Sequence, residues 1–339
     1  MMKGEVEIVI IGAGGLIGEA LLQMIAEHAW LSGHVELLGR EEAVGQALDF
    51  GRRELVVSDS MLHEFSRKQV VIFTGEETVD SDWLERAQDV GCIILDLSSR
   101  LLANYDLPPV VAAVNPEVIA AVADGGIIAL PDAATTQLVT LLKPIIDTVG
   151  INKVSVFSCH AVSETGRSGV EEMARQTAQL LNAKPVSPLV FSRQIAFNLI
   201  PLVGSLQNEC QSDVERKIVD DSKKVLGRSD MNLSINCCWA PVFFGHSQAV
   251  DLQFDTLQSE VQLKKRLSDF PGITLFYTSD SYPTAVTDAS GNDSLAVGRI
   301  KSDSESSTDF SLWTVADNLR FGIAGNAVKI VEVLVKDYL

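Results

Sequence analysis

The feature that most constrains the fold of this chain is a glycine-rich turn that follows a buried strand. Segment Glu5–Ile11 ends in a continuous apolar run, and Gly12–Gly18 separates it from apolar residues at helical spacing that begin near Leu21. An apolar run without alternation is typical of a parallel strand that is covered on both faces. The order strand, glycine turn, helix therefore predicts the first unit of a doubly wound parallel sheet.

The same turn predicts a dinucleotide site. Gly12 permits the tight turn, and Gly15 and Gly18 let the backbone approach a pyrophosphate and let the helix pack on the strand. With Leu16 and Ile17 they form our candidate cofactor loop. The alternative is a glycine-rich turn that binds no ligand.

A basic residue follows the second expected strand, His34–Gly39. Arg40 lies where the adenosine ribose of a dinucleotide would be, and it would pair with the 2′-phosphate of NADP. Glu41–Glu42 follow at once and would repel that phosphate, so a solvated charged turn is the alternative and the choice between NAD and NADP stays open. Thr74 and Gly75, which follow a later apolar strand, complete the candidate cofactor contacts.

Two domains are expected from the length of 339 residues and from a change of pattern along the chain. Strand–helix alternation, with strands expected at 92–96 and 109–113, predicts a Rossmann-type domain over residues 1–130. Longer strands and amphipathic helices then predict an α+β domain over 131–315. Residues 313–339 have helical spacing, and we expect the helix 316–339 to close the first domain.

Charge and cysteine content exclude several classes of protein. The net charge is −18 and there is no basic stripe, which disfavours binding to nucleic acid or to an anionic membrane. We expect no signal peptide and no membrane span, since no apolar run is long enough. Five scattered cysteines without a CxxC pair fit free thiols in a reducing cytoplasm. A cytoplasmic protein with a small-molecule ligand is the expectation.

A second strand–turn–helix corner, Leu130–Leu138, carries no nucleophile. Enzymes often place one at such a corner, because a helix N-terminus stabilises an anion. Here Asp132 is followed by Ala133 and Ala134, which have neither a proton to give nor a lone pair. Taken alone, the segment also fits an ordinary corner with Asp132 as N-cap and Thr135–Thr136 in the first turn.

Several separate segments resemble the aspartate-β-semialdehyde dehydrogenase family, and the likeness spans nearly the whole chain. These segments are Gly12–Gly18, Ala196–Pro201, Pro241–Ser247, Gly291–Asp293, Val297–Ile300 and Asp317–Arg320. The chain looks most like the divergent Usg-type paralogues of that family. The resemblance implies NADP or NAD as cofactor and a homodimer formed through the second domain. It also implies a biosynthetic reaction in which aspartyl phosphate is reduced through a cysteine thioester while a histidine moves protons.

The resemblance further implies that this chain has lost the family's nucleophile. Ala133 stands at the cysteine position, so no covalent intermediate forms there. Trp239 replaces an arginine that holds the substrate carboxylate, and a phosphate-binding arginine falls at about Leu102, with Arg100 close by. Asp132 replaces an asparagine and would repel an anionic substrate.

Other positions of the resembled site are kept or altered. His246 matches the proton-shuttle histidine, although local hydrogen bonding is an equally good reason for its presence. Asn318 matches a contact to the nicotinamide amide, with a helix N-terminal cap as the alternative. The remaining matches are Lys217 at a substrate lysine, His160 at an active-site glutamine, and Ser163-Glu164 at a Ser-Gly turn that meets the nicotinamide.

Two further hypotheses concern the neighbourhood of His160. Cys159 would be a migrated nucleophile only if it faced the same site, and the strand period places it on the opposite face, which favours a buried inert thiol. Convergence of His160, His246 and Asp132 would suit a divalent metal, but we assign no metal site.

Three functions remain open from the sequence. The first is a degenerate family member that keeps the dinucleotide fold and the dimer surface and has a regulatory role or pairs with an active paralogue. The second is an NAD(P)-dependent oxidoreductase that transfers hydride to an aldehyde or oxo group without covalent capture, with His246 or His160 as proton donor. The third is a structural interaction protein with an empty cofactor groove.

Overall fold

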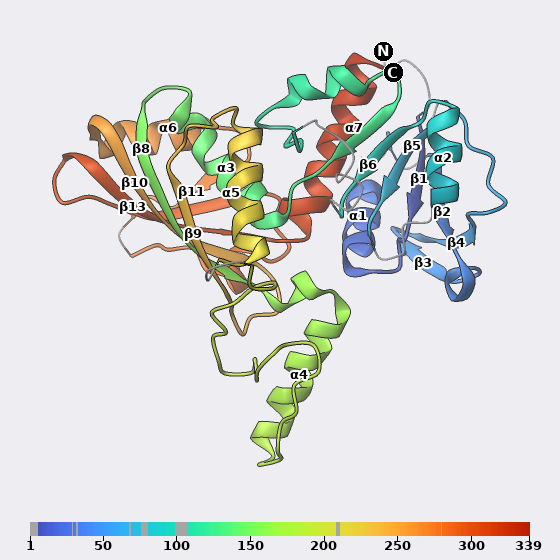
Figure 1. The fold of residues 1–339 in the computed structure, drawn as a ribbon, viewed down its shortest axis with the longest axis horizontal. Coiled ribbons are helices and arrows are strands. Elements are labelled where there is room, and N and C mark those ends of the chain that lie inside the picture. Colours follow the sequence, from blue (N-terminus) through green and yellow to red (C-terminus); the bar gives the residue numbers. More distant parts are fainter. Residues whose placement is uncertain are drawn as a thin grey trace. The chain divides into compact units, whose positions relative to one another are not determined.

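The computed structural model describes residues 6–28, 30–31, 33–67, 69–75, 81–98, 108–207, 211–278 and 280–339. The chain forms two units (Figure 1). The first contains the residues up to Asp132 together with Ile323–Leu339, and the second is Ala133–Gly322. Within the described residues, no helix combines the length and the apolar character that crossing a membrane requires.

The first unit is built on a seven-stranded sheet of order β3-β4-β2-β1-β5-β6-β7. Its strands are β1 (Glu7–Ile11), β2 (Val35–Gly39), β3 (Ala47–Phe50), β4 (Arg53–Asp59), β5 (Gln69–Phe73), β6 (Ile93–Asp96) and β7 (Gly126–Ala129). Only the β3–β4 pair of this sheet is antiparallel. The strand order reverses at β1, between β2 and β5, so the loop after β1 lies at a topological switch point. The expected doubly wound parallel sheet is confirmed.

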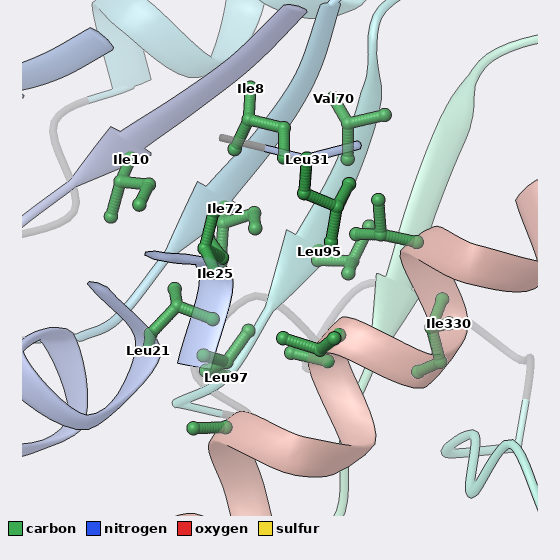
Figure 2. Close-up of a cluster of buried hydrophobic side chains, with 14 of the residues drawn as sticks. Ile8, Ile10, Leu21, Ile25, Leu31, Val70, Ile72, Leu95, Leu97 and Ile330 are labelled. Atoms are coloured by element: carbon green, nitrogen blue, oxygen red, sulfur yellow. The ribbon is translucent and has the colours of Figure 1, made fainter. Parts of the chain in front are cut away.

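Helices cover both faces of this sheet. They are α1 (Leu16–Glu27), α2 (Ser81–Asp89) and α7 (Gly325–Asp337), with the short 3-10 turns η1 (Glu41–Ala43) and η3 (Pro116–Val122). On one face, Ile10 and Leu95 of the strands pack against Leu21 of α1 and Ile330 of α7 (Figure 2). On the other face, Trp83 of α2 packs against a second cluster. Burial on both faces explains why the strands lack alternation.

The strand expected at 109–113 is wrong. Residues 109–111 form no strand and 112–114 form a turn, and the adjacent prolines Pro108 and Pro109 lack the N–H groups that a sheet requires. A backbone bond, from the N–H of Val110 to the carbonyl of Ala129 at 2.8 Å, joins this segment to β7. The buried side chain of Asn326 in α7 holds the turn instead. Its Oδ1 accepts from the N–H of Ala112 at 2.9 Å, and its Nδ2 donates to the carbonyl of Val110 at 2.8 Å.

The second unit contains a six-stranded mixed sheet of order β11-β12-β13-β10-β8-β9. Its strands are β8 (Ile151–His160), β9 (Leu233–Trp239), β10 (His246–Ser259), β11 (Ile273–Leu275), β12 (Leu295–Lys301) and β13 (Ser306–Ala316). The central strand β10 pairs antiparallel with β8 and β13, whereas β9 pairs parallel with β8. The α+β expectation is confirmed, although β12 and β13 were not foreseen.

Helices α3 (Ala133–Ile146), α5 (Asp213–Val225) and α6 (Glu260–Asp269) pack on one face of this sheet through a single apolar cluster. The unit also contains the short turns η4 (Val162–Thr165) and η6 (Ala285–Ala289), and a further turn, η7 (Arg320–Ala324), crosses the boundary between the units. Helix α4 (Arg167–Leu181) and the segment that follows it extend away from the sheet (Figure 1). We call residues 182–207 the arm.

The terminal helix begins later than predicted. Residues 313–316 belong to β13, which stays paired with β10 as far as Ala316. The carboxylate of Asp317 then accepts from the N–H groups of Leu319 and Arg320 and starts the turn η7, and α7 begins only at Gly325. Residues 316–322 consequently lie in the second unit rather than in the closing helix.

Candidate functional site

The loop after β1 has the backbone geometry that a diphosphate requires. Gly12 has a φ of 82°, in the region that favours glycine. Gly15 is the N-cap of α1 and has no side chain to occupy the N–H groups of the first turn, where Leu16 and Ile17 lie. A Cβ on Gly18 would lie 2.3 Å from the carbonyl oxygen of Ala13, so α1 meets the loop only with glycine there. These residues fit a dinucleotide.

Two other predicted cofactor contacts, Thr74 and Gly75, lie directly after β5, next to the loop that follows β1. The hydroxyl of buried Thr74 lies 2.6 Å from the carbonyl oxygen of Gly12 and donates to it, which fixes the loop. Gly75 has a φ of 89°, and a Cβ there would lie 2.4 Å from the Cβ of Ser98. Arg40 is the half-buried N-cap of η1, directly after β2, as the sequence predicted.

In the second unit, the start of α3 is closely packed. Ala133 is the first residue of α3 and is 6% exposed. A Cβ on Gly322 would lie 2.5 Å from the Cβ of Ala133, so these two residues pack against each other. Gln248 of β10 donates to the carbonyl oxygen of Ala134 at 3.0 Å. The first turn of α3 is thereby tied to the end of β10 that carries His246.

Three predicted site residues lie side by side on the face of the sheet that α3 covers. The register of β10 with β8, and of β8 with β9, places His246, His160 and Trp239 next to one another. The ring centroids are 4.7 Å apart for the two histidines and 6.0 Å apart for His160 and Trp239. Both histidines are buried.

A carboxylate bridges the two histidines. The Oε2 atom of Glu164, in η4, lies 2.5 Å from Nδ1 of His160 and 3.2 Å from Nε2 of His246. The other nitrogen of His246, Nδ1, accepts from the backbone N–H of Ala161 at 3.1 Å. Neutral His246 therefore carries its proton on Nε2, which lies on the side of Glu164 but makes no aligned hydrogen bond among the described residues. From the sequence we expected Glu164 near the cofactor and did not predict this bridge, for which its spacing of four residues from His160 was the available signal.

The contact between Glu164 and the two histidines shifts the pKa values of His160 and Glu164 in opposite directions. Burial lowers the pKa of His160, but the Glu164 carboxylate and the Cys237 thiol outweigh it, and the pKa lies well above the ordinary value. Burial raises the pKa of Glu164, but both histidines hold it far below the usual range. The pair therefore favours a protonated His160 beside an ionised Glu164. Within the described residues, Nε2 of His160 is buried without a hydrogen bond.

The same three side chains are of types that bind metals, and their ligand atoms lie within 4.8 Å of one another. A histidine that binds a metal through one nitrogen usually donates a hydrogen bond through the other. His246 does the opposite, because its Nδ1 accepts from Ala161. This tautomer favours a hydrogen-bonded carboxylate over a metal. The hypothetical third ligand, Asp132, belongs to the first unit, and Glu164 is the carboxylate beside the histidines.

Cys159 does not replace the missing nucleophile. It lies on the opposite face of β8 from His160, and its sulfur is 3.7 Å from that of Cys238. Cys159 is partly exposed, so the predicted burial is wrong, and the hydrogen bond from Cys238 lowers the pKa of its thiol to about 7. The lack of reactivity stays a prediction. Cys237 and Cys238 lie in β9, as expected.

Ser163 and Asn318, both predicted to meet the nicotinamide, bind each other. The Nδ2 of Asn318 donates to Oγ of Ser163 at 3.0 Å, and its Oδ1 accepts from the N–H of Gly245 at 2.9 Å. Asn318 is not a helix cap, because Asp317 accepts from the N–H groups of the next turn. The pair connects η4, the β9–β10 loop and the end of β13.

The predicted substrate residues are only partly described. Lys217 of α5 forms an ion pair with Asp221 one turn further on, and its side chain is 39% exposed. Leu102 and Arg100 lie outside the described residues, so the predicted loss of the phosphate-binding arginine stays a prediction.

We expect Glu164→Gln to change how stability depends on pH. A raised folded-state pKa means that His160 contributes stability fully below about pH 6.5 and loses it as the pH rises through the folded-state value. Without the carboxylate, burial dominates and the sign reverses. The stability gap between wild type and variant should widen as the pH falls from about 8 to about 5.5, by about 1.4 kcal/mol per unit of pKa difference.

Urea unfolding at several pH values measures this gap. Glu171→Gln, at an exposed position on α4, is the control and should parallel wild type. A gap that stays constant over this range would show that Glu164 does not hold a charged histidine.

Comparison with known proteins gives a consistent result. Residues 7–122 match the model "Semialdehyde dehydrogenase, NAD binding domain", and residues 142–321 match "Semialdehyde dehydrogenase, dimerisation domain". An aspartate-semialdehyde dehydrogenase from a Shewanella species is 34% identical over 99% of this chain and 100% of its own. A USG-1 protein homolog from Pseudomonas aeruginosa is 37% identical over 100% of both chains. The structure of aspartate semialdehyde dehydrogenase II from Vibrio cholerae, complexed with ASA, superposes with a TM-score of 0.93 at 35% identity and covers 99% of this chain and 100% of that one.

Proposed function

The chain belongs to the semialdehyde dehydrogenase family, and we propose that it is a catalytically degenerate member: a dinucleotide-binding homodimer that cannot reduce aspartyl phosphate. One observation carries the proposal. Ala133 is the first residue of α3, at the position where the family resemblance places the nucleophilic cysteine. A methyl group forms no thioester, and loss of a nucleophile that acts together with its base leaves little activity. Its function is then regulatory, or lies in pairing with an active paralogue.

The surroundings of the histidines support the same conclusion. Nε2 of His246, the atom that would take a proton, faces the Glu164 carboxylate. Trp239 packs against His160 and the ring of Phe191, and an indole offers no bidentate contact to a substrate carboxylate. An assay with aspartate semialdehyde, phosphate and NADP tests the proposal, and turnover at the rate of an active relative would contradict it.

Dinucleotide binding is supported by the loop after β1. Gly12 and Gly18 leave room for the backbone to approach a pyrophosphate, and Thr74 holds the loop in place. Calorimetric titration with NAD and with NADP should give saturable binding of at least one of them. If neither NAD nor NADP binds, a structural interaction protein with an empty cofactor groove is favoured.

The homodimer is supported by the arm. Buried Glu172 of α4 accepts from the N–H of Leu189 at 3.0 Å, and buried Gln176 accepts from that of Ile195 at 2.8 Å, so the arm's backbone is fixed. Some apolar side chains of the arm nevertheless stay in solvent, with Leu189 79% and Phe197 67% exposed, while others such as Phe191 and Ile195 are buried. Fixed backbone that presents apolar side chains is typical of a surface that another subunit covers.

We expect Leu189→Asp to weaken the dimer by at least about tenfold, since a charge would be buried in an apolar contact. Sedimentation velocity over a concentration series measures the dissociation constant. Leu257→Asp, at a residue of β10 that is 69% exposed and outside the arm, is the control and should leave the constant unchanged. Equal dissociation constants for the two variants would show that the arm is not part of the dimer interface.

A second candidate function is hydride transfer to an aldehyde or oxo group without covalent capture. The observation that favours it is the tautomer of His246, which keeps a proton on Nε2 beside cationic His160. A screen of aldehydes and ketones with NADH and NADPH separates the two functions. Turnover that is lost in His246→Ala would support the oxidoreductase.

A further inference from the structure

Glu164 differs from Glu172, the buried carboxylate of α4, in what it binds. Glu172 accepts from the backbone N–H groups of Leu189 and Val190 and from Gln176, so it holds the arm in place. Among the described residues, the carboxylate of Glu164 makes hydrogen bonds and ion pairs only with His160 and His246. Glu164 therefore binds side chains as a bound ligand would, whereas Glu172 caps backbone N–H groups.

The two rings are held in position by contacts other than those with Glu164. His246 is fixed by the N–H of Ala161 at Nδ1, and the register of β8 with β10 sets its neighbour. His160 lies between His246 and the Trp239 ring on the same sheet face. Both histidines are at most 1% exposed, while the side chain of Glu164 is 27% exposed. The carboxylate therefore approaches two fixed nitrogens from the solvent side.

We propose that His160 and His246 form a binding site for a small carboxylate, that Glu164 occupies this site in the intact chain, and that shortening Glu164 opens it to free carboxylates. One oxygen, Oε2, contacts both Nδ1 of His160 and Nε2 of His246, which is the contact that an external carboxylate would reproduce. An anionic ligand of this region has to compete with the chain's own side chain. The inference depends on the second unit alone and is independent of dinucleotide binding and of turnover.

Charge balance explains why a vacated site would recruit an anion. The ionisable neighbours of His160 are Glu164, His246, the Cys237 thiol and the Cys159 thiol. Cys159 lies on the opposite face of β8, where it accepts a hydrogen bond from Cys238. Glu215 of α5 accepts from the N–H of Cys237 at 2.9 Å. Burial raises the pKa of Cys237, so that thiol stays neutral and supplies no counterion. Without Glu164, a buried imidazolium has to lose its proton or bind another anion.

The experiment compares sodium formate with sodium chloride at equal ionic strength, on the full chain. In Glu164→Ala, formate should raise Tm saturably, by several degrees more than chloride does, and should shift the ring ¹⁵N signals of His160 towards those of wild type. Wild type and Glu171→Ala should respond to the two salts alike. A formate response that is absent from Glu164→Ala, or equally large in wild type, would overturn the proposal.

Two further variants test the geometry. Glu164→Gln fills the same space with a neutral amide, so formate should have no specific effect on it, and a clear response would overturn the proposal. This variant also keeps the inference testable if Glu164→Ala does not fold, because the His160 ¹⁵N signals should then report a neutral ring at pH 7. A cationic His160 in Glu164→Gln would show that Glu164 is not its counterion. Adding His160→Ala to Glu164→Ala should abolish the formate effect.

Discussion

Replacing Ala133 by cysteine will leave this protein at least about a thousandfold less active on aspartate semialdehyde than an active relative. The substitution restores a thiol at the first residue of α3, where the helix dipole favours the thiolate. It does not restore the rest of the site. Trp239 cannot make a bidentate contact with a carboxylate. Nε2 of His246 carries a proton and faces Glu164, so it is not available as a base.

Steady-state rates with aspartate semialdehyde, phosphate and NADP measure this outcome. Ala134→Cys is the matched control, because it places a thiol one residue further along the same buried turn. Both variants should be similarly inactive, while Ala133→Cys combined with Trp239→Arg and Glu164→Gly should gain activity over either. A single Ala133→Cys variant within tenfold of an active relative would refute the view that several groups of the site have been lost together.

Gly18→Ala should destabilise the first unit by about 3 kcal/mol and abolish dinucleotide binding. The added methyl would lie 2.3 Å from the carbonyl oxygen and 2.5 Å from the carbonyl carbon of Ala13, and both of these are backbone atoms. Backbone atoms cannot relieve such a clash by a change of rotamer, as the end of a side chain can, so α1 has to move away from β1. That movement displaces the first-turn N–H groups from the position that a pyrophosphate needs.

Gly14→Ala is the matched control in the same loop. The nearest heavy atom to a Cβ there is Oε1 of Gln46 at 3.9 Å, which is an ordinary contact, and Gly14 is exposed. Its effect on stability should stay within about 0.5 kcal/mol. Denaturant unfolding and calorimetric titration with NAD and NADP measure both variants. Equal stability of the two would show that α1 accommodates a methyl group at its third residue.

Much of the first unit could be predicted because its signals are local. A continuous apolar run, a glycine loop and a helical pattern lie within about twenty residues of one another, and each has a direct backbone cause. The wrong strand at 109–113 shows the limit of the apolar pattern, since Val110 and Val111 are buried in a segment that follows two prolines and forms no strand. The late start of α7 has a similar cause: Asp317 ends the strand with hydrogen bonds that apolar spacing does not reveal.

The sequence by itself determined that residue 133 has no reactive group, because the identity of a side chain does not depend on how the chain folds. It also determined the glycines of the candidate cofactor loop, where the backbone approaches so closely that a Cβ would not fit at Gly18. Only the tertiary structure decided that Glu164 bridges His160 and His246 and that Ala161 sets the tautomer of His246. Those contacts depend on the register of β8 with β10, strands far apart in the chain, and register is set by packing across the whole sheet rather than by any one segment.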